Sequence, residues 1–426
     1  MIHAAAATGT LTGLTVAGVQ LAGLVVVPSL LQQAGMPFAG AYTAYVLAAV
    51  LSTFLLGMQR LPLLSVTPTA IAGWLVYVRG ISAGLSWQQL LGVSAAVSLL
   101  LVVLSLLWQR KGPAVVLPPP VEWGLSGGCG LLLVVLGLTQ GRLLVAAPWA
   151  GSPTPMMLGD MQDPMAYLSL CGIVVTLALL FLRVSRELSL FLGMMVTAAV
   201  ALAEGFWALP AAPCMLPEGL DVTALQLTLL PARDGDAVRM LGTGLALGLA
   251  LLCLNEGVLA AAGCRRRSEV SAGLGIVSAV GSFVGSLPVA LSPLSILAGQ
   301  QKDSGTRRPA LTAAVLLLAA LFFEPVLAAL ADFPAPAVPV LVVGGLLMLE
   351  HTVRTAAASL SDRAGYLAGM LTVFLIPLAG DFVVGLGAGC LAWSGSHILA
   401  GRGSVLTWPV RGLSIFFLVY FILLTW

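Results

Sequence analysis

One acidic residue inside an apolar stretch is the side chain of this sequence best suited to chemistry. Glu256 lies in the run Leu-Leu-Cys-Leu-Asn-Glu-Gly at 251–257, and the nearest basic residue along the chain is Arg265. A charged side chain in a membrane interior costs about 2.5–3.5 kcal/mol or more, so the few that occur there bind substrates, carry protons or pair with another helix. We therefore expect Glu256 to bind a substrate, carry a proton, or do both.

Two short segments share an unusual pattern of proline and hydroxyl residues. Residues 61–73 read LPLLSVTPTAIAG, and residues 287–299 read LPVALSPLSILAG. A proline in a membrane segment frees backbone groups that must find partners other than lipid, so both segments face protein or water. We expect short extended pieces at 62–69 and 288–295 that run into half-helices, whose N-terminal amides attract a polar or anionic solute.

Hydroxyl and amide side chains near these breaks complete the predicted substrate site. They are Thr67, Thr69, Ser292 and Ser295 on the two segments, Asn255 beside Glu256, and Gln20 in the middle of the first apolar run. Glu324 is a second residue for proton coupling, although its place toward one end of its span also suits a structural role. The alternative is that both segments are kinked packing helices whose hydroxyls bond to their own backbone, and that Gln20 is a packing contact.

The composition defines the elements that must position these residues. Of 426 residues, 59% are hydrophobic and 8% are charged, and the mean hydropathy is +1.05. Globular proteins carry about 25% charged residues, so this composition excludes a soluble enzyme, a disordered chain and a nucleic-acid binder. It leaves an all-α polytopic membrane protein. The six cysteines show no CxxC spacing, and we expect no disulfide, metal or cofactor.

Cuts at proline, glycine and charge clusters predict fourteen transmembrane segments of about 20 residues, arranged as two sets of seven. Residues 1–209 form the first set, 210–238 an extracytoplasmic connecting loop, 239–404 the second set, and 405–426 a terminal apolar segment. A cytoplasmic N-terminus places most of the 19 Lys and Arg residues at cytoplasmic ends. The two proline segments are the third of each set, so the second copy enters the membrane upside down, as in the inverted repeats of transporters. The alternative is a chance match in a chain with 25 Pro and 48 Gly.

With these residues in view, the sequence resembles the nucleobase:cation symporter 2 (xanthine/uracil permease) family, and within it the guanine/hypoxanthine permease branch. The similar stretches are 18–28, 61–68 followed by 86–92, and 336–349. The resemblance implies a seven-plus-seven inverted repeat with a core and a scaffold domain, short strands on segments three and ten, a homodimer, and a hydrogen bond from Glu256 to the base. The sequence departs from the family where Leu294 and Ser295 replace an acidic or amide residue, and where Leu21 replaces a histidine.

The sequence thus predicts a secondary active transporter that takes up a nucleobase, a purine or a uracil-like base, by alternating access with H⁺ or Na⁺ as the coupling ion. Its partners are the small-molecule substrate and membrane lipid, and its location is a bacterial-type inner membrane. The alternative on the same fold is a sulfate-permease-like transporter of anions or carboxylates, although a carboxylate at position 256 repels an anion unless it is protonated.

An enzymatic function is a third alternative. Residues 124–128 read Gly-Leu-Ser-Gly-Gly, which fits the G-x-S-x-G pattern of a serine nucleophile. Small residues at such spacing in an apolar helix are better explained by close helix packing. We therefore expect no enzymatic activity.

Overall fold

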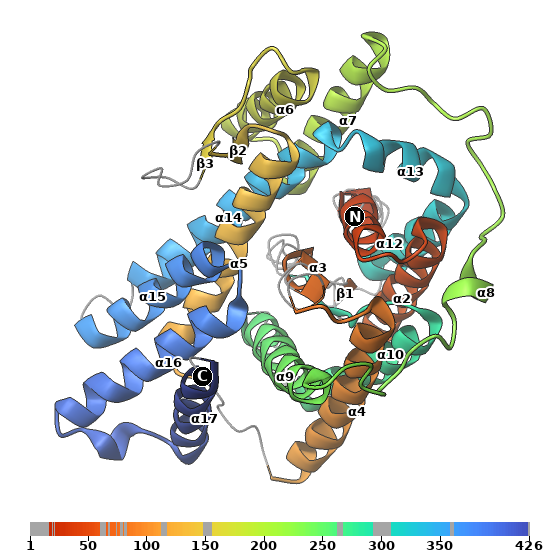
Figure 1. Cartoon of the computed structure of the whole chain (residues 1–426). Coiled ribbons are helices and arrows are strands. Elements are labelled where there is room, and N and C mark those ends of the chain that lie inside the picture. Colours follow the sequence, from red (N-terminus) through yellow and green to blue (C-terminus); the bar gives the residue numbers. More distant parts are fainter. Residues whose placement is uncertain are drawn as a thin grey trace.

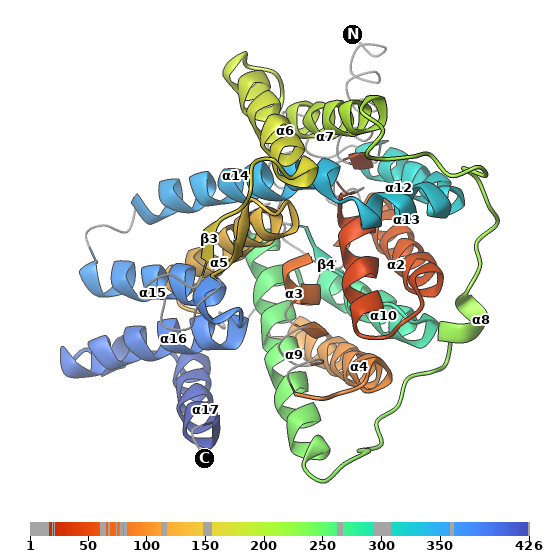
Figure 2. The same cartoon turned by 45° about the horizontal axis from the view of Figure 1, so that its top comes forward.

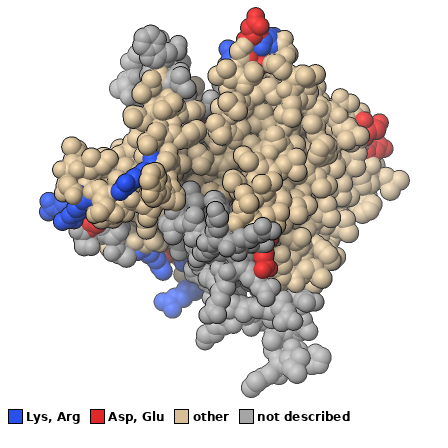
Figure 3. Space-filling model, turned by 90° about the horizontal axis from the view of Figure 1, so that it is seen from below, with Lys and Arg blue, Asp and Glu red and all other residues tan. Residues whose placement is uncertain are grey.

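A computed structural model of the chain describes residues 17–18, 20, 22–59, 65–66, 69–73, 75–76, 80, 83–111, 117–147, 156–261, 267–292, 308–357 and 362–424. Within these ranges, nine helices are long and apolar enough to cross a membrane, and four shorter apolar helices accompany them. Few charged side chains interrupt the face drawn in Figure 3. The prediction of a helical, multi-pass membrane protein is confirmed.

Helix ends coincide with prolines, glycines and capping residues, and prolines and glycines were among the signals used to cut the sequence into segments. Pro119 and Pro164 each stand in the first turn of a helix, where proline is well tolerated. Asp163 caps the second of these helices by accepting a hydrogen bond from the Met165 N–H at 2.9 Å. Gly380, with φ of 62°, ends another helix in the left-handed conformation. The helices are the first helix, continuous over Ala22–Gln33, then α2 (Phe38–Met58), α3 (Thr69–Gly73), α4 (Trp87–Lys111), α5 (Pro119–Gln140), α6 (Pro164–Phe181), α7 (Arg186–Ala203), α8 (Leu220–Thr223), α9 (Asp236–Ala261), α10 (Arg267–Val284), α12 (Arg308–Ala320), α13 (Glu324–Asp332), α14 (Val338–Ala357), α15 (Arg363–Ala379), α16 (Phe382–Leu399) and α17 (Trp408–Leu424).

The helices gather into two bundles, which lie side by side in both ribbon views (Figures 1 and 2). The core bundle comprises the first helix, α2, α3, α4, α9, α10 and α12. The scaffold bundle comprises α5, α6, α7, α14, α15 and α16, with α5 packed along α14 and α15. The bundles touch where α3 and α9 contact α5 and where α9 contacts α16. Helix α9, on which Asn255 and Glu256 were predicted to bind substrate, therefore lies at the boundary between the bundles.

Helix contacts within each bundle come in matching pairs. In the core bundle, α2 packs against α12 and α10 packs against α4; in the scaffold bundle, α5 packs against α15 and α14 packs against α6. In the predicted count, equivalent segments are seven apart, which makes α2 equivalent to α10, α4 to α12, α5 to α14 and α6 to α15. Replacing each helix by its equivalent turns the α2–α12 contact into the α10–α4 contact. The same replacement turns the α5–α15 contact into the α14–α6 contact. An inverted repeat predicts this exchange of contacts.

The connection between α7 and α9 runs along the outside of the core bundle (Figures 1 and 2). Its backbone N–H groups at Met215, Leu225 and Thr228 donate to carbonyl oxygens of Phe322, Phe283 and Gln88, at 3.0, 2.7 and 3.0 Å. Through these bonds the connection is fastened to helix ends that are far apart in the sequence. Between α5 and α6 along the chain, strands β2 (Leu144–Ala146) and β3 (Met156–Leu158) form an antiparallel pair.

The scaffold bundle depends on glycines that let helix backbones approach closely. A Cβ atom built at Gly130 of α5 would lie 2.8 Å from the carbonyl oxygen of Gly345 on α14. A Cβ atom at Gly124 would lie 2.6 Å from the carbonyl oxygen of Gly369 on α15, and one at Gly127 would meet Thr352. The G-x-S-x-G pattern of residues 124–128 therefore lies in a helix interface, which favours the packing interpretation over a nucleophile.

Gly130→Val should lower the melting temperature of the purified protein, because the side chain would collide with the α14 backbone. Overpacking of this kind costs about 1–3 kcal/mol. Thermal unfolding in detergent measures the effect, with Gly395→Ala on α16 as the control, since a Cβ atom there has no heavy atom within 4 Å. Equal melting temperatures for wild type and Gly130→Val would contradict the close approach of α5 and α14.

Candidate functional site

The two proline segments meet as a two-stranded antiparallel sheet inside the core bundle. Strand β1 (Ser65–Val66) pairs with strand β4 (Ala290–Leu291), with Ser65 opposite Leu291 and Val66 opposite Ala290. Pro288 lies in the non-helical stretch 286–289 that joins α10 to β4. The strand pairing satisfies backbone groups that a broken membrane segment cannot leave exposed to lipid. Extended backbone is thus present at 65–66 and at 288–292, and α3 follows the first piece; the remaining parts of 62–69 and 288–295, and the half-helix predicted after 295, lie outside the described residues.

The register of this sheet is centred on equivalent positions of the two segments. Ser65 lies four residues after Leu61, and Leu291 lies four residues after Leu287, the first residues of the two Leu-Pro dipeptides. These equivalent residues are each other's partners in the sheet. A two-fold axis that relates the two segments would pass between two equivalent residues that face each other in the sheet. Ser65 and Leu291 are such a pair.

Side chains from α9 and α10 hold the outer edge of β4. The Leu291 N–H donates to Asn255 Oδ1 at 2.9 Å. The Val289 N–H donates to Ser278 Oγ at 3.1 Å, and this hydroxyl also lies 3.1 Å from the Val289 carbonyl oxygen, to which it donates. In an extended chain, alternate N–H groups point to the same side. The strand is thus bonded to β1 along one edge and to two helices along the other.

The first helix reaches the same place. Gln20 Nε2 donates to Ser292 Oγ at 3.2 Å, and both side chains are buried. Ser292 directly follows β4, so Gln20, Asn255 and Ser292 converge on residues 291–292 from three elements. These three residues were predicted from the sequence to share one site, and the structure brings them together.

Other predicted site residues lie elsewhere or outside the described residues. Glu256 follows Asn255 in α9 and Thr69 opens α3, but the side chains of both lie outside the described residues. Thr67 and Ser295 lie wholly outside them. Glu324 opens α13, where it lies within electrostatic range of Glu218 on the connection between α7 and α9. Within the described part of the chain, no hydrogen bond or ion pair joins Glu324 to the β1–β4 pair.

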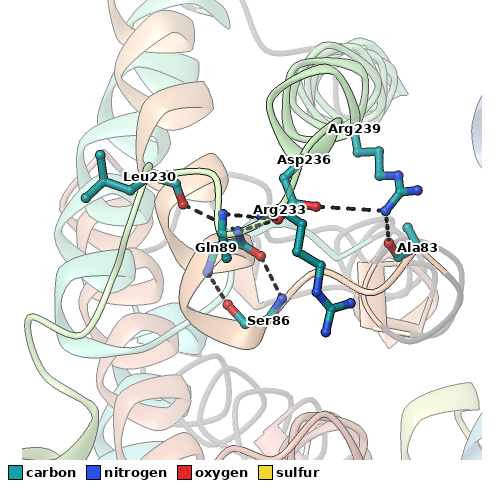
Figure 4. A network of polar contacts seen from close by, with 8 residues as sticks. Ala83, Ser86, Gln89, Leu230, Arg233, Asp236 and Arg239 are labelled. Atoms are coloured by element: carbon teal, nitrogen blue, oxygen red, sulfur yellow. Dashed lines mark hydrogen bonds and ion pairs between the residues drawn. The ribbon is translucent and has the colours of Figure 1, made fainter.

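A second polar cluster, which the sequence analysis missed, surrounds Asp236 at the opposite end of α9 (Figure 4). Asp236 is 1% exposed, and its Oδ2 accepts hydrogen bonds from Gln89 Nε2 at 3.2 Å and from the backbone N–H groups of Ala232 and Arg233 at 3.2 and 3.0 Å. Arg239 lies 3.8 Å from Asp236 Oδ1. At about 1.5 Å per residue, this cluster and Asn255 are roughly 28 Å apart along the helix.

Gln89 links this cluster to the start of α4. The Ser86 N–H donates to Gln89 Oε1 at 2.9 Å, and the Gln89 N–H donates to Ser86 Oγ at 3.3 Å. This reciprocal pair is a capping box, and the spacing S-x-x-Q before an apolar run is its signature in the sequence. The spacing could have identified the cap, but it could not have identified Asp236 Oδ2 and the Leu230 carbonyl oxygen as the acceptors of the Gln89 amide hydrogens.

No protein-family model matches the chain. The chain is 25% identical over 402 residues to the guanine/hypoxanthine permease PbuO of Bacillus subtilis, covering 89% of this chain and 88% of that protein. It is also 25% identical over 434 residues to a Methanocaldococcus jannaschii protein named only as a permease, covering 98% and 95%. The resemblance to the nucleobase permease family is confirmed. The relatives are named as permeases rather than as enzymes, and the chain is a membrane transport protein.

Solved structures of anion carriers share the fold. The chain aligns with SLC26A9 at a TM-score of 0.61 and 14% identity, covering 92% of this chain and 64% of that chain. It aligns with the transmembrane domain of the cyanobacterial bicarbonate transporter BicA at a TM-score of 0.56 and 19% identity, covering 89% and 97%. At these identities the likeness shows the fold alone.

Gln89→Leu should destabilise the protein, because it removes a hydrogen bond to the buried Asp236 carboxylate and one half of the α4 cap. The loss of a hydrogen bond to a buried charged group costs about 1.5–3 kcal/mol. Thermal unfolding of the purified variant measures this effect. Gln88→Leu is the matched control, since Gln88 is its partly exposed neighbour. A melting temperature no lower for Gln89→Leu than for Gln88→Leu would contradict a stabilising role for the cluster.

Proposed function

We propose that this chain is a secondary active transporter that takes up a nucleobase, a purine or a uracil-like base, across a bacterial-type inner membrane. Guanine/hypoxanthine permeases are related to it over almost its whole length. The observation that carries the proposal is the convergence of Gln20, Asn255 and Ser292 on the β1–β4 pair. Buried polar side chains that converge between helices of a bundle are typical of a binding site for a small polar ligand.

The proposed substrate site centres on Glu256. It directly follows Asn255, whose side chain reaches β4, so the α9 backbone at residue 256 passes close to the strand pair. A carboxylate there would accept N–H groups of a base, while Gln20 and the hydroxyls of Thr67, Thr69, Ser292 and Ser295 could both donate and accept. Such groups match the alternating donors and acceptors of a base edge. Protonation of Glu256 would couple uptake to H⁺, with Glu324 as a second proton carrier. Na⁺ is the alternative coupling ion.

We infer that transport proceeds by alternating access, in which the core bundle moves against the scaffold bundle. The contacts of α3 and α9 with α5 form part of the surface along which the bundles would move. The exchange of helix contacts and the Ser65–Leu291 register support fourteen segments in two inverted sets of seven. The placement of Lys and Arg supports an N-terminus in the cytoplasm. The family resemblance adds a homodimer. The proposal requires no cofactor.

Transport of an anion or a carboxylate on the same fold is the second proposal. It is supported by the likeness to SLC26A9 and to BicA, which is named as a bicarbonate transporter. A carboxylate at position 256 would repel such a substrate unless a proton neutralised it. For this reason we place the nucleobase first.

Uptake of radiolabelled guanine, hypoxanthine and uracil into proteoliposomes tests the proposal. The uptake of radiolabelled sulfate and bicarbonate is measured in parallel. We expect uptake of at least one base, accelerated by an inward H⁺ or Na⁺ gradient. Glu256→Gln should reduce it at least about tenfold, because the variant loses the charge that binds the base and carries the proton.

The matched control is Glu269→Gln, the same substitution at an exposed residue in the first turn of α10, which should leave uptake unchanged. Uptake of anions without uptake of any base would overturn the nucleobase assignment in favour of the second proposal. Full base uptake by Glu256→Gln would remove Glu256 from the mechanism.

A further inference from the structure

The two broken segments cross at the β1–β4 strand pair, and this crossing is short within the described residues. There, strands β1 and β4 have two residues each, and their pairing involves two residue pairs. Isolated two-stranded pairings are marginal even when they are longer. The position of β4 therefore depends on further contacts, which include the hydrogen bonds that the Val289 and Leu291 N–H groups donate to Ser278 Oγ and Asn255 Oδ1 along its outer edge.

Asn255 is the stronger determinant of the two for the site. Its hydrogen bond to Leu291 joins residues 36 positions apart, and both residues are buried, at 6% and 0% exposed. Leu291 is also the residue that pairs with Ser65. A single amide oxygen thus connects α9, which carries Glu256, to the central residue pair of the crossing.

The chemistry of the side chain fits this connection. Leu291 offers one N–H donor, and an amide oxygen accepts it without adding a charge beside Glu256. An ionised aspartate would also accept it, but would place two carboxylates on adjacent residues, where like charges disfavour ionisation. Successive residues of a helix project about 100° apart, so a rotation or shift of α9 that moves residue 255 also moves residue 256.

We propose that Asn255 is a positioning residue, which fixes the rotation and height of α9 relative to β4 and thereby sets where Glu256 stands at the crossing. This assignment replaces the sequence-based expectation that Asn255 contacts the substrate, and it rests on the proposed function for the role of Glu256. Contact between Oδ1 and a substrate would require its bond to Leu291 to be broken.

Amide hydrogen exchange of the full chain in lipid nanodiscs tests the hydrogen bond between Asn255 and Leu291 without any substrate. In Asn255→Leu, the Leu291 amide should exchange at least about tenfold faster than in wild type, because its acceptor is lost. Asn255→Asp retains an acceptor oxygen and should keep this amide slow. Ser278→Ala should accelerate Val289 more than Leu291. If Asn255→Leu does not fold, Asn255→Ser gives the same reading with a side chain too short to reach the strand.

Binding of a panel of bases separates positioning from direct contact. A positioning role predicts that Asn255→Leu weakens guanine, hypoxanthine, xanthine and uracil by similar factors, with partial recovery in Asn255→Asp. A selective loss for bases that share one polar group would show direct contact and overturn the proposal. Unchanged exchange of Leu291 in Asn255→Leu would also overturn it. If no base binds the wild type, the proposed function fails. The exchange rate of the Leu291 amide still decides whether Asn255 holds β4.

Discussion

A broken membrane segment must satisfy its free backbone groups without water, and the centre of this protein is organised by that constraint. Within the described residues, each broken segment contains a two-residue strand, and the two strands pair with each other. The outer edge of β4 then takes its partners from Ser278 and Asn255. The helices around the crossing carry polar side chains where the backbone needs them, and these side chains form a buried polar site inside the core bundle.

The two bundles differ in where the broken segments lie. The scaffold bundle has helices that pack through glycine, such as Gly130 against Gly345. The core bundle contains both interrupted segments, and its contacts with the scaffold include those of α3 and α9. A bundle that carries the polar crossing beside a second bundle suits a transporter in which the substrate site moves relative to the scaffold.

Much of this arrangement was predictable from the sequence, because local signals determine it. Apolar length and proline or glycine at the ends located the helices, and the repeated Leu-Pro pattern located the breaks. The shared site of Gln20, Asn255 and Ser292 was predicted from polar residues in the middle of apolar runs or beside the breaks. The actual partner of Asn255, the register of Ser65 with Leu291, and the link from Gln89 to Asp236 did not follow, because long-range pairing leaves no local signal. A polar residue in an apolar run looks the same whether it faces substrate or backbone.

Disulfide cross-linking across the crossing tests the central claim most directly. Opposed residues of an antiparallel pair have Cα atoms about 4.5–5.5 Å apart, within the range of a disulfide. With the native cysteines replaced, Ser65→Cys combined with Leu291→Cys should cross-link rapidly under mild oxidation in the membrane. Val66→Cys combined with Leu291→Cys should not, because those positions are out of register and on opposite faces. No cross-link in the first pair, or equal cross-linking in both, would contradict the pairing of the two broken segments.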